Sequence, residues 1–150
     1  MNNNIEILLI EDNPHEAELA IRSLMKNNIA NNIVHIDDGA DALDYIMGTG
    51  KYADVQKRNV NRLILLDLNL PKVDGLEILK QVKSNEKTCM TPVVVLTSSK
   101  EEKDMIESYR LGVNSYIVKP VNFESFSEAI AELKMYWLLL NQWPPLNNKY

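Results

Sequence analysis

The chain has 150 residues, of which 45% are apolar and 25% charged, and its formal net charge at pH 7 is −5. This length and composition indicate one globular domain and exclude a disordered chain. The negative charge argues against non-specific nucleic-acid binding, and the longest apolar run, residues 135–140, is too short for a membrane span. Cys89 is the only cysteine, and the amino terminus lacks a secretion signal, so we expect a cytoplasmic protein.

Five apolar runs recur at intervals of roughly 25–30 residues, which is the length of a βα unit. Two of them are continuous rather than alternating, a pattern typical of strands that are covered on both faces of a parallel sheet. The five predicted strands are residues 5–10, 33–36, 63–66, 93–96 and 116–118.

The segments between the runs carry helix start signals. Asn13 is a capping residue, Pro14 stands at the first helical position and Glu16 is an acid two residues further on. Apolar residues at 17, 20, 21, 24 and 25 then form one helical stripe. Later helices are predicted to begin at Asp38, at Asp74 with Glu77 and at Ser99 with Glu102, the last pair being a capping box, and to end near Gly48 and Gly112.

Strand and helix therefore alternate five times. This is the pattern of an α/β domain with a parallel sheet and right-handed crossovers. Residues 49–62 form a polar connection that is longer than most loops of this kind, and we interpret them as a solvated loop. His15 and His35 are interpreted as structural residues.

The chemically capable residues follow the predicted strands. Glu11 and Asp12 come after the first strand, Asp67 after the third, Thr97 after the fourth and Lys119 after the fifth. Because ligands of open parallel sheets bind beyond the carboxyl ends of the strands, these side chains would meet at one edge if the first and third strands are neighbours.

Three carboxylates at one place repel one another unless a cation lies between them. Mg²⁺ prefers carboxylates, water and phosphate oxygens as ligands, whereas Lys119 would pair with Asp67 or with a phosphate as a point charge. Thr97 could donate a hydrogen bond to a phosphoryl oxygen. This set suits phosphoryl transfer, with Asp67 as the carboxylate nucleophile.

Four segments resemble the receiver domain of two-component response regulators. They are EDNP at 11–14, LILLDLNLPKVDG at 63–75, VVVLTSS at 93–99 and YIVKP at 116–120. The resemblance covers residues 5 to about 135 in order and with the spacing of the family. It implies a doubly wound (βα)5, flavodoxin-like three-layer sandwich with the parallel strand order 2-1-3-4-5.

The resemblance also implies a role for each site residue. Asp67 would accept the phosphoryl group, and Asp12 and Asp67 would ligate Mg²⁺ directly, with Glu11 close by or acting through water. The backbone carbonyl of Asn69 would complete the protein ligands.

Three further residues would respond to the phosphate. Thr97 would grip the phosphoryl group while Lys119 pairs with it, and Tyr116 would move inward as the aromatic switch. Such a protein is not an enzyme beyond its own phosphorylation and dephosphorylation, and it signals through a change of shape.

The end of the chain predicts partners. We assign residues 1–135 to the receiver and 136–150 to an extension of the last helix and a tail, with no separate output domain. The last helix is predicted to have one core-facing stripe, formed by Phe123, Phe126, Ile130, Leu133, Trp137 and Leu140. Over residues 135–140, however, the helix is apolar on every side. We therefore expect a homodimer through this helix. The YWLLLN segment at 136–141, followed by two prolines, resembles receivers of bacterial phytochrome-type histidine kinases and suggests such a kinase as partner.

Two alternatives belong to other classes of protein. A phosphohydrolase with an aspartyl-phosphate would be expected to carry a second acid two residues after Asp67, where this chain has Asn69. A flavin-binding protein would need a Ser/Thr/Gly-rich phosphate loop after the first strand, where the acids of EDNP would repel phosphate.

Overall fold

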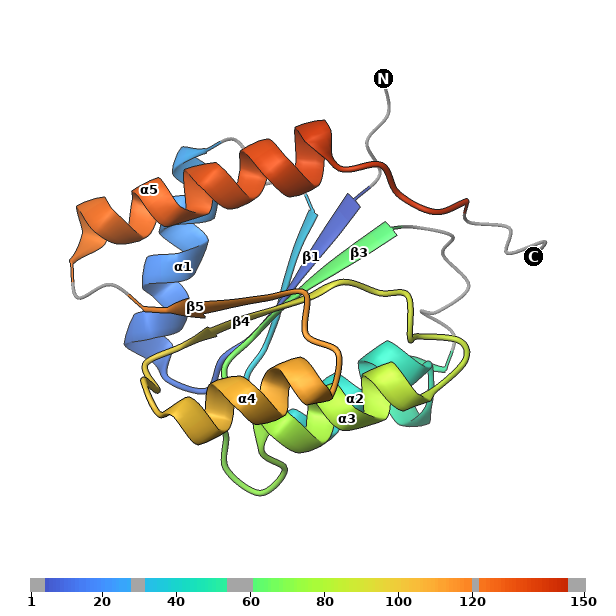
Figure 1. Ribbon diagram of the computed structural model, residues 1–150. Coiled ribbons are helices and arrows are strands. Elements are labelled where there is room, and N and C mark those ends of the chain that lie inside the picture. Colours follow the sequence, from blue (N-terminus) through green and yellow to red (C-terminus); the bar gives the residue numbers. More distant parts are fainter. Residues whose placement is uncertain (1–4, 28–31, 54–60, 120–121, 146–150) are drawn as a thin grey trace.

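The computed structural model describes residues 5–27, 32–53, 61–119 and 122–145. Five parallel strands form one sheet in the order β2-β1-β3-β4-β5, which confirms the predicted doubly wound fold. Helices α1 and α5 cover one face of the sheet, and α2, α3 and α4 cover the other (Figure 1). The elements are β1 (Ile5–Ile10), α1 (Pro14–Lys26), β2 (Ile33–Ile36), α2 (Gly39–Met47), η2 (Gly50–Tyr52), β3 (Asn61–Leu66), α3 (Gly75–Ser84), β4 (Val93–Thr97), α4 (Glu102–Arg110), β5 (Ser115–Val118), α5 (Phe123–Leu133) and η4 (Lys134–Leu140).

The central strands are buried on both faces, as their continuous apolar runs predict. Successive side chains point to opposite faces of a strand. Leu8, Ile64 and Val95 therefore join the core beneath α2 and α3. Leu9 and Leu65 join the second core, beneath α1 and α5. The sheet is thus a rigid support whose carboxyl edge holds the residues of interest.

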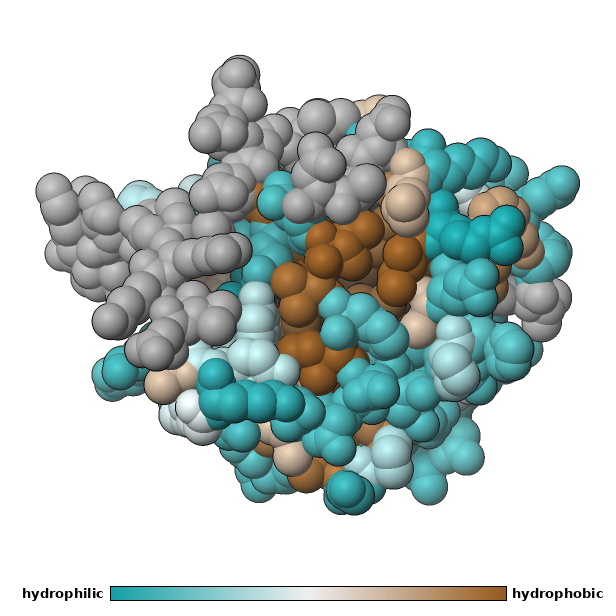
Figure 2. Space-filling model, turned by 180° about the vertical axis from the view of Figure 1, so that it is seen from behind, coloured by the Kyte–Doolittle hydropathy of each residue, from teal (hydrophilic) through white to brown (hydrophobic). Residues whose placement is uncertain are grey.

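The edge strand β2 is less buried than the central strands. Ile33 and Val34 are half-buried, whereas Ile36 is buried. The view from behind shows a strip of apolar residues surrounded by hydrophilic ones (Figure 2). Partly exposed apolar residues of this kind are normal on the surface of a globular protein.

Three predicted helix starts are confirmed. The side-chain oxygen of Asn13 accepts hydrogen bonds from the backbone N–H of His15 at 3.0 Å and of Glu16 at 3.1 Å. Asp38 and Asp74 cap α2 and α3 in the same way, each accepting from the backbone N–H three residues further on. These caps satisfy N–H groups that have no partner inside the helix.

The predicted capping box at Ser99 is wrong. Helix α4 begins at Glu102, and Glu101 rather than Ser99 precedes it. The Ser99 hydroxyl instead donates to the carboxylate of Asp104 at 2.6 Å. The predicted end of α4 is confirmed, because Gly112 has a φ of 99°, a left-handed conformation that glycine adopts without strain.

The last helix continues past α5 into the π-helical segment η4. Phe126 and Ile130 are buried as predicted, whereas Leu140 is 61% exposed, so the predicted core-facing stripe does not reach the end of the helix. After the helix, the indole N–H of Trp143 donates to the carbonyl of Trp137 at 3.0 Å.

Parts of two predicted segments lie outside the described residues. These parts are residues 54–60 of the polar connection and residues 146–150 of the tail. Within the described part of the chain, no helix is both long and apolar enough to cross a membrane.

Candidate functional site

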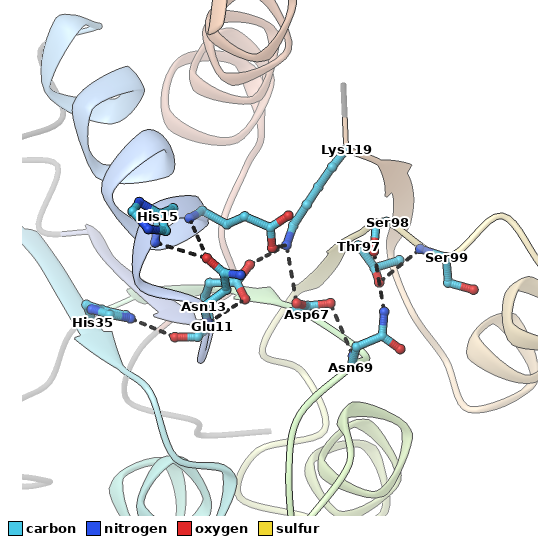
Figure 3. Close-up of polar contacts among 11 residues, drawn as sticks. Glu11, Asn13, His15, His35, Asp67, Asn69, Thr97, Ser98, Ser99 and Lys119 are labelled. Carbon is cyan, nitrogen blue, oxygen red and sulfur yellow. Dashed lines mark hydrogen bonds and ion pairs between the residues drawn. The ribbon is translucent and has the colours of Figure 1, made fainter. Parts of the chain in front are cut away.

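The acidic residues after β1 and β3 lie side by side. The last residues of these strands are paired in the parallel ladder, so Glu11 and Asp67 leave neighbouring strands at the same level. Carboxylate oxygens of Glu11, Asp12 and Asp67 lie within 4.8 Å of one another. Glu11 and Asp67 are buried, and Lys119 points toward both (Figure 3). The structure therefore brings together the three acids that the sequence predicts at one sheet edge.

The start of α3 fixes the backbone at Asp67. A Cβ atom on Gly75 would lie 2.4 Å from the carbonyl oxygen of Asp67 and 2.6 Å from Cα of Leu68, so only glycine fits at this position. The N–H of Gly75 donates to the carbonyl of Leu68 at 3.1 Å. One carboxylate oxygen of Asp67 accepts the N–H of Asn69 at 3.2 Å. The Asp67 side chain is therefore oriented in part by its own turn.

Lys119 reaches this acidic group from the end of β5. Its N–H donates to the carbonyl of Thr97 at 2.8 Å, which continues the ladder between β4 and β5. Its side chain is 7% exposed and forms ion pairs with three carboxylates, those of Glu11, of Asp67 at 3.2 Å and of Glu16 at 2.7 Å. The pairing of Lys119 with Asp67, expected from the sequence, is present.

Glu16 is a member of this group that was not predicted from the sequence. In the sequence this residue was interpreted only as part of the start signal of the helix that follows Asn13. The available signal was its position. Because α1 begins directly after Glu11 and Asp12, a long side chain in its first turn lies above the same sheet edge.

Burial and neighbouring charge shift the protonation of this group. Burial, together with the nearby carboxylate of Asp67, raises the pKa of Glu11 to about 7, although Lys119 acts in the opposite direction. Burial alone would lower the pKa of Lys119, but its hydrogen bonds to Glu11 and Glu16 and the charge of Asp67 raise it above its ordinary value. Lys119 is therefore charged in this structure.

Thr97 and Tyr116 are connected through Ser99. Thr97 is fully buried at the end of β4, and its hydroxyl accepts the N–H of Ser99 at 3.3 Å. The half-buried Tyr116 donates its hydroxyl proton to the carbonyl of Ser99 at 3.1 Å. Both residues were predicted from the sequence to respond to a phosphate. The connection between them through Ser99 was not predicted, because Ser99 was interpreted as a helix cap.

Comparison with protein families identifies the class of the chain. The model of the response regulator receiver domain matches residues 7–131. The chain belongs to the response regulator receiver family. The strand order and the acidic group at the carboxyl edge of this receiver agree with that assignment.

Relatives of this receiver match nearly its whole length. A probable methanogenesis regulatory protein, FilR2 of Methanothrix harundinacea, is 41% identical over 138 residues, which are 92% of this chain and 86% of FilR2. The response regulator Rcp1 of Synechocystis is 38% identical over 132 residues, 88% of each chain. A crystal structure of the phosphorylated cyanobacterial phytochrome response regulator RcpA superposes with a TM-score of 0.86 at 35% identity, covering 96% of this chain and all of RcpA.

The acidic group of this receiver fits a hard divalent cation. Its donors are carboxylate oxygens, the ligands that Mg²⁺ and Mn²⁺ prefer. Burial beside Asp67 raises the pKa of Glu11, and a bound cation would oppose this rise by stabilising the ionised carboxylate. Rcp1 has also been crystallised in an Mn(2+)-bound form, which superposes with a TM-score of 0.82 at 36% identity and covers 95% of this chain and 99% of that one. Glu11, Asp12 and Asp67 are the residues that would hold the cation.

Proposed function

We propose that this receiver accepts a phosphoryl group on Asp67 from a sensor histidine kinase and signals through the resulting change of shape. One observation carries the proposal: the buried carboxylate of Asp67 lies beside those of Glu11 and Asp12 and 3.2 Å from the amine of Lys119. A nucleophile, a set of cation ligands and a fixed positive charge thus meet at one place.

The chemistry follows from these positions. A carboxylate oxygen of Asp67 forms the new bond to phosphorus, and the bond to the donor breaks with its electron pair leaving on the donor. Lys119 donates to phosphoryl oxygens, and the hydroxyl of Thr97 can turn to do the same. Bound Mg²⁺ would neutralise negative charge on the acids and on the phosphoryl group. Phosphoryl transfer depends mainly on such positioning and charge neutralisation.

The cation would be held by Glu11, Asp12 and Asp67, with the backbone carbonyl of Asn69 as a further ligand. The first three are supported by their grouping within 4.8 Å. The role of Asn69 rests on the family resemblance and on its position in the turn that holds Asp67.

The shape change would begin at Ser99. If the side chain of Thr97 moves so that its hydroxyl reaches a phosphoryl oxygen, its oxygen would move away from the N–H of Ser99, whose carbonyl accepts the hydroxyl proton of Tyr116. Release of Tyr116 would then let the ring move inward. A ligand shifts an equilibrium only through such a difference in contacts between two states.

The partners belong to the same proposal. A phytochrome-type kinase is supported by the likeness to RcpA, a cyanobacterial phytochrome response regulator. A homodimer through the last helix is supported by three apolar side chains that are more than half exposed there, those of Met135, Tyr136 and Leu140. We place the protein in the cytoplasm and assign it no membrane partner. We also assign it no nucleic-acid partner, in keeping with its net charge of −5. Residues 1–135 would form the receiver and 136–150 its extension.

A phosphohydrolase remains the second candidate from the enzyme class, but the site disfavours it. The side-chain amide of Asn69 lies 3.5 Å from the hydroxyl of Ser98 and has no proton-transfer chemistry to offer. Turnover of a small phosphate ester by the purified protein would favour this candidate instead.

Phosphorylation by acetyl phosphate tests the proposed function. The purified protein, incubated with acetyl phosphate and Mg²⁺, should gain the mass of one phosphoryl group. Asp67→Asn should abolish the gain, and chelation of Mg²⁺ should prevent it. Asp37→Asn is the matched control, because Asp37 is an exposed acid that follows β2 at the same end of the sheet. No gain in the parent would refute the reaction, and a gain that survives in Asp67→Asn would refute the site.

A further inference from the structure

Glu16 stands apart from the other acids around Lys119. It lies in the first turn of α1, where its own N–H is held by the cap oxygen of Asn13 at 3.1 Å. Its carboxylate is 39% exposed and lies 2.7 Å from the amine of Lys119, closer than the carboxylate of Asp67 at 3.2 Å. It does not belong to the group of three carboxylates suited to a cation. Its negative charge therefore acts on Lys119 rather than on a metal.

The hydrogen-bonding capacity of Lys119 is filled. An ammonium group has three N–H donors, and here they are directed to Glu11, Glu16 and Asp67. A phosphoryl group on Asp67 brings additional acceptor oxygens that need the same donors. Glu11 and Asp67 would turn toward a bound cation, whereas Glu16 has no such alternative. Glu16 is consequently the carboxylate that continues to compete for Lys119 when the site is loaded.

We propose that Glu16 is a positioning residue that slows phosphorylation of Asp67 by competing with the incoming phosphoryl group for the amine of Lys119. This inference rests on the proposed function. Lys119 must give up part of its ion pair with Glu16 before it can stabilise charge that develops on the phosphoryl oxygens. An interaction that is stronger before the reaction than in the transition state slows the chemical step.

The test compares two neighbouring glutamates. Glu16→Gln removes the ion pair and one negative charge, whereas Glu18→Gln removes one negative charge from an exposed position on the same helix. At saturating Mg²⁺ we expect Glu16→Gln to be phosphorylated by acetyl phosphate about two- to fivefold faster than the parent, the range of a partly exposed ion pair. Glu18→Gln should react at the parent rate.

Glu16→Asp separates the ion pair from the charge. Its carboxylate is shorter by one methylene group and cannot keep a 2.7 Å contact with Lys119, yet the negative charge stays nearby. If the ion pair is responsible, Glu16→Asp will react as fast as Glu16→Gln. A parent-like rate in Glu16→Asp would overturn the role of the ion pair.

An equilibrium measurement excludes a purely structural effect. Beryllofluoride occupies the place of a phosphoryl group, so Glu16→Gln should bind it about two- to fivefold more tightly in a calorimetric titration with Mg²⁺. A change in stability alone would not tighten this binding. Equal rates and equal beryllofluoride affinities for Glu16→Gln and Glu18→Gln would overturn the inference. If the parent itself gains no phosphoryl mass, it is the proposed function that fails.

Discussion

Lys119 is almost excluded from solvent, yet its charge is balanced by acids on three different elements. Glu11 follows β1, Glu16 lies in α1 and Asp67 follows β3. Burying a charge is costly unless it is paired, and breaking a buried pair leaves the remaining charge without compensation. The ammonium group therefore stabilises the fold of this edge before any phosphate arrives.

Replacement of Lys119 should make stability depend on the cation. Lys119→Met leaves the buried carboxylates of Glu11 and Asp67 without their positive partner, so we expect the free energy of unfolding to fall by about 3 kcal/mol in metal-free buffer. Added Mg²⁺ should restore part of this loss, and the rise in Tm on adding Mg²⁺ should be larger than in the parent. Thermal and urea unfolding with and without Mg²⁺ measure both effects.

The control for this experiment is Lys80→Met, because Lys80 is an exposed lysine on α3. It should unfold as the parent does in both buffers. If Lys119→Met proves as stable as the parent without Mg²⁺ and responds no more strongly to it, the balance of charge described for Lys119 is wrong.

Single residues of the site differ in how far the sequence predicts them. Asp67 and Lys119 follow strands and Thr97 ends one, and strands of a parallel sheet end at one edge, so their meeting could be anticipated. The participation of Glu16 could not be anticipated, because its ion pair with Lys119 depends on the reach of two long side chains between α1 and the end of β5. The connection of Thr97 and Tyr116 through Ser99 could not be predicted either, because it uses backbone atoms of Ser99, which carry no signal in the sequence.

At the scale of whole elements, one cluster joins α2 to two strands. The hydroxyl of Tyr45, in α2, donates to the carboxylate of Glu6, in β1, at 2.5 Å. The same carboxylate forms an ion pair with Arg62, in β3, at 2.5 Å, and the guanidinium lies 4.8 Å from the centre of the Tyr45 ring. Three elements are thus held together by polar contacts outside the proposed phosphorylation site.

This cluster should give the fold a dependence on alkaline pH. Burial, together with the hydrogen bond to Glu6, raises the pKa of Tyr45 to about 12, whereas an unfolded tyrosine titrates near pH 10. The folded chain therefore keeps the proton to higher pH than the unfolded chain. The contribution to stability is full below pH 10 and is lost as the pH rises through 12.

Tyr45→Phe should remove both the hydrogen bond and this pH dependence. We expect a loss of about 1 kcal/mol in the free energy of unfolding near pH 8, because one buried hydrogen bond is lost. The difference from the parent should shrink between pH 10 and 12. Urea unfolding across this range measures it, with Tyr109→Phe as control, since Tyr109 is 58% exposed. A difference that stays constant up to pH 12 would contradict the assigned shift.

The elements themselves were largely predictable. Strands β1 and β2 begin and end where their apolar runs do, and the other three differ by at most two residues at an end. In the central strands β1, β3 and β4, burial on both faces leaves a strong signal in the sequence. Helix starts were predictable where a capping side chain has no competing partner. At Ser99 the hydroxyl donates to Asp104 instead of capping α4, and a sequence pattern cannot distinguish these two uses of one oxygen.

The whole molecule leaves an apolar surface at the end of its last helix. Met135 and Tyr136 are 54% and 53% exposed. The next residue, Trp137, is partly buried against the core, as is Trp143. A cavity of about 570 Å³ adjoins this surface and is lined by β5 and the last helix, including Ile117, Tyr136 and Trp137. Exposed apolar side chains beside a hollow suit contact with another protein surface, which under the proposed function is a second copy of the chain.

Introducing a charge on this surface should separate the copies. Met135→Glu places a carboxylate where the proposed dimer would exclude water, and an unpaired buried charge opposes association. Met25→Glu is the matched control, because Met25 is also 54% exposed but lies on α1. In sedimentation velocity the parent and Met25→Glu should form dimers, whereas Met135→Glu should remain monomeric at the same concentration, whether or not it carries phosphate. A monomeric parent at high concentration would refute the dimer, and a Met135→Glu variant that dimerises as the parent does would place the interface elsewhere.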